Sequence, residues 1–96
     1  MREQEIGGLM RHRLKIKQIY LCRILEGVKT FEICNNDRDF QVGDTIRFLP
    51  LKDERYNAYD IASPIPEYVI TYILSDAPGL QQHYVALSIS PKSKTS

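Results

Sequence analysis

The stretch QIYLCRILEGVKTFEICN, residues 18–35, changes its hydrophobic period in the middle and thereby decides the fold class. Before Gly27, apolar residues recur four positions apart, which is the spacing of one helix face. After it, apolar and polar residues alternate, with Phe31 and Ile33 on the same face, as in a strand. Glycine suits the end of a helix because it adopts positive φ without steric cost. The stretch therefore predicts a helix over about 18–26 that leads directly into a strand.

Short strands are also predicted on both sides of this stretch. Alternating or β-rich runs place them at residues 12–17, 29–35, 44–52, 67–75 and 84–90. A loop at 53–66 separates two of them, and loops of this length in a small domain are often functional. One helix with most strands in the second half favours an α+β domain. We expect a five- to six-stranded, mostly antiparallel small β-barrel, because closure removes exposed sheet edges, with the helix packed against it.

The length of 96 residues is that of one domain. We expect this domain to cover residues 12–90. Residues 1–11 contain a Gly7–Gly8 pair and no hydrophobic period, so they are predicted to be a flexible extension. Residues 91–96 are predicted to be a flexible polar tail.

The composition is that of a soluble globular protein, with 43% hydrophobic and 26% charged residues. No apolar run approaches a membrane span, and no signal-peptide pattern follows the first residue. We therefore expect a cytoplasmic protein that does not engage a membrane and whose two cysteines, Cys22 and Cys34, are reduced. His12 and His83 stand apart from any metal-ligand pattern, so neither a metal nor a cofactor is predicted.

Positive charge is concentrated near the N-terminal side. Residues 11–29 contain six basic groups and one acid, a local charge of +5 in a chain whose net charge is +1. Such asymmetry favours an anionic partner. The alternative is a solvated basic face, which is common on small domains.

Four motifs together resemble the ASCH-like domains of the PUA-like superfamily, in a phage and bacterial branch without an assigned function. They are HRLKIK (12–17), ILEGVKTFEI (24–33), NDRDFQVGD (36–44) and YVALSI (84–89). The resemblance spans residues 12–89 and implies a small β-barrel with a cleft between the helix and the barrel. The family motif Gly-x-Lys-x-x-Glu-x-Arg is matched by Gly27, Lys29 and Glu32.

Cys34 stands where this motif has its arginine. A small, mostly apolar thiol replaces a charged group that can bind an anion with two hydrogen bonds. Arg38, or the nearby Asn35 and Asn36, are candidates to substitute for it. Cys34 itself is not expected to act as a nucleophile, because no neighbouring histidine would activate it.

The resemblance implies binding of RNA or a nucleotide as the function. Lysines would neutralise phosphates, Glu32 would accept from a base amino group or orient Lys29, and exposed aromatic rings would stack on unpaired bases. The predicted nucleic-acid-binding residues are Lys15, Lys17, Tyr20, Lys29, Glu32 and Arg38. Phe40, Tyr56 and Tyr59 are further stacking candidates. The alternative for each aromatic residue is a place in the core, and for Lys29 and Glu32 it is a structural ion pair.

The resemblance also implies a second possible function, amide hydrolysis of a modified nucleoside, so the sequence leaves open whether the protein is an enzyme. Lys29 matches the lysine of such hydrolases, but Glu32 occupies the position of their threonine nucleophile. Thr30 lies two residues away, roughly 6.6 Å along a strand. If the protein is an enzyme, these three residues are the catalytic candidates. A third hypothesis is a protein-interaction module that uses the loop at 53–66.

Polar residues near the predicted turn, and His12, can also have purely structural roles. Asp37, Arg38 and Asp39 form either the rim of a site or a solvated turn. Asp44 is expected to cap a turn. His12 is expected to be a structural or surface residue.

Overall fold

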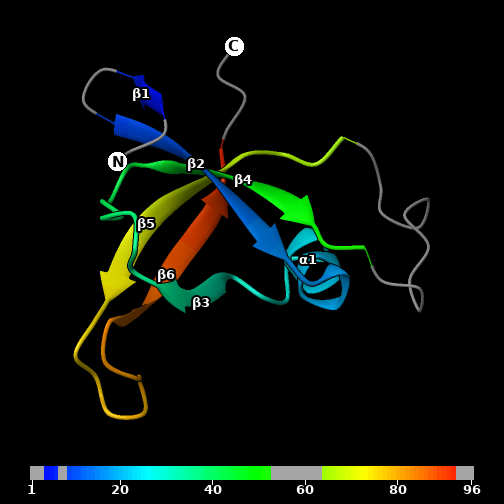
Figure 1. Ribbon diagram of the computed structural model, residues 1–96. Coiled ribbons are helices and arrows are strands. Elements are labelled where there is room, and N and C mark those ends of the chain that lie inside the picture. The colour runs from blue at the N-terminus through cyan, green and yellow to red at the C-terminus, as the bar shows by residue number, and fades with distance from the viewer. Residues whose placement is uncertain (1–3, 7–8, 53–63, 93–96) are drawn as a thin grey trace.

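The computed structural model describes residues 4–6, 9–52 and 64–92, which form one curved sheet and one helix (Figure 1). The elements are β1 (Gln4–Ile6), β2 (Leu9–Ile16), α1 (Gln18–Leu25), β3 (Phe31–Asn35), β4 (Thr45–Pro50), β5 (Tyr68–Leu74) and β6 (Tyr84–Pro91). The predicted helix and the five predicted strands are all present within a few residues. β1 was not predicted: it lies with the start of β2 inside the segment expected as an extension. Most of the predicted loop at 53–66 falls outside the described residues.

The sheet has six strands in the order β1-β2-β4-β5-β6-β3. β2 and β4 pair in parallel, and the other four ladders are antiparallel. The prediction of a mostly antiparallel sheet is therefore confirmed. The parallel pair requires a long connection between its strands, and α1 and β3 lie within it.

The predicted closure into a barrel is wrong, because β1 and β3 form the two ends of the sheet and no ladder joins β3 to β2 among the described residues. β1 occupies one edge of β2 only at Leu9–Arg11. Beyond that point, β2 faces β3 across a gap. A side chain spans this gap in place of backbone pairing, since Arg38 Nη1 donates a hydrogen bond to the carbonyl of Arg13.

The hydrophobic core lies on one side of the curved sheet. Alternate residues of β2, β4, β5 and β6 point into it, and α1 contributes Leu21 and Ile24. The helix lies beyond the C-terminal ends of β2 and β4 (Figure 1). Gln18, in its first turn, is buried, and its Nε2 donates to the carbonyl of Leu51 at 2.8 Å. This bond ties the start of the helix to the end of β4.

A buried polar cluster joins the start of β2 to the turn before β4. Asp44 caps this turn as predicted, since its Oδ2 accepts from the backbone N–H of Gln41 at 3.1 Å. Its carboxylate also contacts His12 and the backbone of Met10. The ring of Phe40 packs against His12, with centroids 4.6 Å apart, and is only 4% exposed. Phe40 is therefore a core residue, and its proposed role in base stacking is wrong.

Within the described part of the chain, no helix is long and apolar enough to cross a membrane.

Candidate functional site

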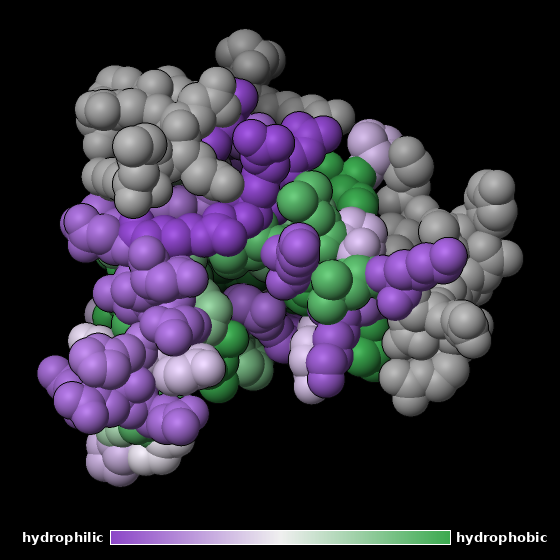
Figure 2. Space-filling model, in the orientation of Figure 1, coloured by the Kyte–Doolittle hydropathy of each residue, from purple (hydrophilic) through white to green (hydrophobic). Residues whose placement is uncertain are grey.

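Two hollows follow one another along β3. The first, here called the junction pocket, lies where α1 leads into β3 and has a volume of about 390 Å³; its walls are Tyr20, Lys29, Phe31, Glu32 and Ile33. The second, here called the seam pocket, lies between β2 and β3 and has a volume of about 550 Å³. It is lined by Arg13, Leu14, Lys15, Cys34, Asn35, Asp37, Arg38 and Leu49. Figure 2 shows a hollow on this side of the molecule, with hydrophilic side chains on both sides of it.

Lys29 is the centre of the junction pocket. Its Nζ lies 2.5 Å from Glu32 Oε1 and donates to the Phe31 carbonyl at 2.6 Å. The two charged side chains are only 16% and 15% exposed. The ion pair considered from the sequence is therefore present. An ammonium has three N–H donors, so these bonds leave one donor available.

Aromatic rings flank the same ammonium group. Lys29 Nζ lies 5.4 Å from the centroid of Tyr20 and 4.8 Å from that of Phe31, within cation–π range. Lys17 Nζ also lies near Tyr20, 5.8 Å from the centroid of its ring. Both rings are nearly half exposed, at 44% and 45%. Lys17, Tyr20, Lys29 and Glu32, four of the six predicted binding residues, are thus brought together.

The turn after α1 holds Lys29 in this position. Gly27 has φ +82°, a conformation that favours glycine. The backbone N–H groups of Val28 and Lys29 both donate to the Arg23 carbonyl at 3.1 Å. These bonds fold the chain back at the end of the helix and direct the next strand past Tyr20. The Gly-x-Lys part of the motif is therefore a helix ending that places a lysine beside an aromatic ring.

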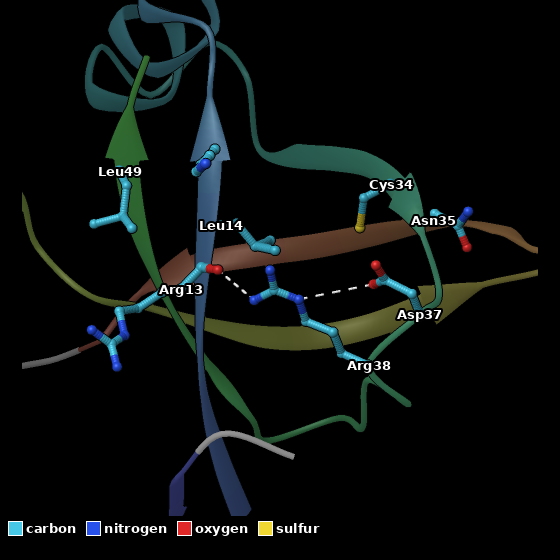
Figure 3. Close-up of a pocket in the computed structure, with 8 residues that line it drawn as sticks. Arg13, Leu14, Cys34, Asn35, Asp37, Arg38 and Leu49 are labelled. Atoms are coloured by element: carbon cyan, nitrogen blue, oxygen red, sulfur yellow. Dashed lines mark hydrogen bonds and ion pairs between the residues drawn. The ribbon is translucent and has the colours of Figure 1, made fainter. Parts of the chain in front are cut away.

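The other two predicted binding residues, Lys15 and Arg38, line the seam pocket (Figure 3). The guanidinium group of Arg38 lies between β2 and β3, where it bonds the Arg13 carbonyl and lies 3.8 Å from Asp37 Oδ1. The thiol of Cys34 points toward the same space, whereas the Arg13 side chain points away. Arg38 is therefore more than a solvated turn residue. Asp37 and Asp39 are exposed, as a turn predicts.

The environment of Cys34 disfavours its thiolate. Burial raises the pKa of the thiol to about 11, and the carboxylates of Glu32 and Asp37 act in the same direction, opposed in part by Arg38. The group is thus protonated at neutral pH, and a protonated thiol is a poor nucleophile. This result agrees with the expectation that Cys34 is not a nucleophile.

Some candidates lie elsewhere. Thr30 is exposed and lines neither pocket; its carbonyl accepts from the Ile89 N–H at 3.0 Å. Tyr56 and Tyr59 fall outside the described residues. No group of three metal-ligating side chains occurs in residues 4–6, 9–52 and 64–92.

Sequence reasoning missed Phe31 and Ile33 as pocket residues. Alternation placed both on one face of the strand, but Phe31 is 45% and Ile33 51% exposed. The sequence feature that could have shown this is the pair Glu32 and Cys34. If their side chains occupy the inner face of β3, Phe31 and Ile33 must lie on the outer face.

The family model described as "Domain of unknown function (DUF3850)" matches residues 11–89. These residues include both pockets and all of the sheet except β1, the start of β2 and the last two residues of β6. A search of curated proteins found no match to the sequence. The chain belongs to the DUF3850 family.

Proposed function

We propose that this DUF3850 domain is an ASCH/PUA-like module that binds single-stranded RNA or a nucleotide in the junction pocket. The supporting observation is the Lys29–Glu32 pair held between the exposed rings of Tyr20 and Phe31. A nucleobase needs a flat apolar surface for its face and hydrogen-bonding groups for its edge. This pocket offers both within about 390 Å³.

The edge of the base would be read by Lys29 and Glu32. One donor of the ammonium remains available, and no described residue bonds Glu32 Oε2. A donor beside an acceptor matches a base edge that presents a carbonyl or ring nitrogen next to an N–H group. Tyr20, on the helix, would stack on the face of the base.

The phosphates of the bound RNA would contact the basic groups beside the junction pocket and in the seam pocket. Lys17 lies beside Tyr20, and Lys15 and Arg38 line the adjoining seam pocket. Arg38 is also our candidate for the missing arginine of the motif, because its guanidinium group lies in the pocket that Cys34 lines. An arginine reaching in from the following loop would supply the planar anion-binding group that a cysteine cannot.

The test is fluorescence anisotropy with a labelled single-stranded RNA and the variant Tyr20→Leu. Loss of one stacked base costs about 1–3 kcal/mol, so the Kd is expected to rise roughly 5- to 150-fold. Val28→Ala is the control, because Val28 is 72% exposed and lines neither pocket. Charge reversal at Lys15, Lys17 and Lys29 should also flatten the salt dependence.

Two outcomes would contradict this proposal. If both the affinity and the salt slope are unchanged by these substitutions, RNA does not bind here. If a modified nucleoside is turned over, and turnover disappears in Lys29→Ala and Glu32→Ala with the fold intact, the domain is the hydrolase considered as the alternative.

A further inference from the structure

The charged pair of the junction pocket offers a ligand more hydrogen-bond acceptors than donors. Two of the three N–H groups of the Lys29 ammonium are bonded, one to the Phe31 carbonyl and one to Glu32 Oε1. One donor of Lys29 therefore remains. A carboxylate has about four acceptor positions, and Lys29 occupies one of those of Glu32. About three remain, since no described residue bonds Glu32 Oε2.

The other walls of the pocket do not offset this excess of acceptors. Phe31 and Ile33 contribute apolar side chains. The hydroxyl of Tyr20 can donate or accept, so it suits either kind of ligand group. The excess also disfavours a phosphate at this point, because an anion needs donors and would meet the open oxygen of Glu32. A ligand that fits must bring more donors than acceptors on the edge that faces Lys29 and Glu32.

Guanine is the one RNA base whose Watson–Crick edge has this composition. The edge presents a single acceptor, the O6 carbonyl, followed by two donors, the N–H at N1 and the amino group at N2. Uracil and cytosine each present two acceptors on this edge, and adenine presents one acceptor and one donor group. Unpaired bases in RNA are read on this edge.

We propose that the junction pocket selects an unpaired guanine. The remaining donor of Lys29 bonds O6, and the carboxylate of Glu32 accepts from the N–H groups at N1 and N2, with Oε2 as the main acceptor. The ring of Tyr20 stacks on the face of the base. The guanine must be unpaired, because a pairing partner would occupy the same edge. This inference rests on the proposed function and names the base that the pocket takes.

Partial burial of the charged pair gives this choice its energetic weight. The side chains of Lys29 and Glu32 are 16% and 15% exposed, so water reaches them only in part. A pyrimidine would bring a second carbonyl oxygen against the carboxylate, and two acceptors that face each other are both left without a donor. One pair of matched hydrogen bonds discriminates against the wrong base by roughly 5- to 150-fold.

The experiment measures fluorescence anisotropy of four labelled RNAs, UUGUU, UUAUU, UUCUU and UUUUU, at one fixed salt concentration. The Kd of UUGUU should be lower than each of the others by roughly 5- to 150-fold. Inosine in place of guanine removes the amino group at N2 and should weaken binding roughly 2- to 12-fold, the effect of one hydrogen bond. 7-Deazaguanine removes only the N7 acceptor of the other edge, so it should bind like guanine.

Free nucleotides distinguish the two sources of a guanine. GMP should compete with the labelled RNA better than AMP, CMP and UMP. Tighter binding of UUGUU than of GMP identifies RNA as the ligand, and equal binding identifies a nucleotide; the preference for guanine is expected in both cases.

The variant Glu32→Gln tests the residue that carries the choice. Glutamine replaces one acceptor oxygen by an amino donor, so the preference for UUGUU over UUUUU should be largely lost. Glu26→Gln is the matched control, because it removes the same charge from a side chain that is 53% exposed and lines neither pocket. The control should keep the preference. The inosine measurement needs no variant, so it stays decisive if Glu32→Gln does not fold.

Two results would overturn this inference and leave the proposed function intact. The first is equal affinity for the four RNAs, with all four weakened by Tyr20→Leu. The second is an inosine RNA that binds as tightly as the guanine RNA while the 7-deazaguanine RNA binds more weakly, which would show that the other edge of the base is read. If no RNA and no nucleotide binds, the proposed function fails and this inference fails with it.

Discussion

His12 Nε2 lies 2.8 Å from Asp44 Oδ2, and both residues are completely buried. The same carboxylate accepts from the backbone N–H of Met10 at 3.0 Å and from that of Gln41 at 3.1 Å. One buried side chain thus satisfies donors on β2 and in the turn before β4. Because His12 and Asp44 are far apart in the sequence, this contact joins two segments that local structure does not bring together.

The variant Asp44→Ala should lower the free energy of unfolding by about 3 kcal/mol or more. It leaves two buried donors, on Met10 and His12, and one partly buried donor, on Gln41, without their acceptor, and each buried loss costs about 1–3 kcal/mol. Urea denaturation followed by circular dichroism measures the change. Asp37→Ala is the control, because the Asp37 side chain is 67% exposed, and should stay within about 0.5 kcal/mol of the wild type. Equal stabilities for the two variants would show that the buried cluster contributes little.

Lys29 and Glu32 should be energetically coupled. Lys29→Met and Glu32→Gln each leave one partly buried charged group without its partner, so the double variant should be more stable than the two single effects predict. We expect a coupling free energy of about 1–2 kcal/mol, between the values of exposed and buried pairs. A double-mutant cycle in urea measures it.

The matched reference for this cycle is the pair of Arg23, in the last turn of α1, and Glu26, the residue that caps the helix. Its atoms lie 2.8 Å apart, but its side chains are 49% and 53% exposed. Its coupling should therefore be about 0.5 kcal/mol or less. If the two cycles return the same value, burial of the Lys29–Glu32 pair has no energetic consequence.

Cys34 should react slowly with iodoacetamide until the solution is strongly alkaline. Its pKa is about 11, so the thiolate is scarce near neutral pH. In a Cys22→Ala background, the alkylation rate should reach half its maximum near pH 11. A midpoint at or below pH 9, the ordinary pKa of a thiol, would show that burial does not raise the pKa of Cys34.

The raised pKa of Cys34 also predicts the direction of a stability change. The folded state disfavours ionisation of this thiol, so its stabilising contribution is complete below pH 9 and is lost as the pH rises toward 11. The difference in unfolding free energy between wild type and Cys34→Ser should therefore fall over that interval. A constant difference would mean that the folded and unfolded chains ionise alike at this position.

Arg38 should contribute to RNA affinity through both its charge and its shape. Arg38→Ala should reduce the salt slope of single-stranded RNA binding by about 0.7, the value for one phosphate contact. Arg38→Lys should restore the slope but bind more weakly, because an ammonium lacks the planar pair of donors. Arg47→Ala, at an exposed position of β4 outside both pockets, is the control. An unchanged slope in Arg38→Ala would exclude Arg38 from the phosphate path.

The elements other than β1, and the residues Tyr20, Lys29 and Glu32 of the junction pocket, were accessible from the sequence because their signals are local. The change of period at Gly27 marks the end of α1, and the residues that meet in the pocket all lie between Lys17 and Ile33. A helix ending with a defined turn places such neighbours together without help from the rest of the chain.

The remaining features depend on contacts between distant segments, which periodicity does not report. Arg38 reaches the Arg13 carbonyl, and His12 reaches Asp44, only because β2 comes to lie near β3 and β4. The open gap between β2 and β3 was missed for the same reason, because the number of strands does not show which sheet edges pair. For β3, alternation defines two faces, but the core alone decides that Phe31 lies outside.

The position of β6 between β5 and β3 has a consequence for how the chain folds during synthesis. Among the described strands, β3 pairs with β6 alone, and the register joins Phe31 to Ser88, 57 residues later in the chain. Pairings between segments so far apart in the sequence form slowly, because the long intervening loop must close before the contact is made. Until residues 84–91 emerge, β3 has no strand partner on either edge. A nascent chain that ends before residue 84 therefore leaves this edge unpaired, and unpaired strand edges of incomplete domains are prone to aggregate.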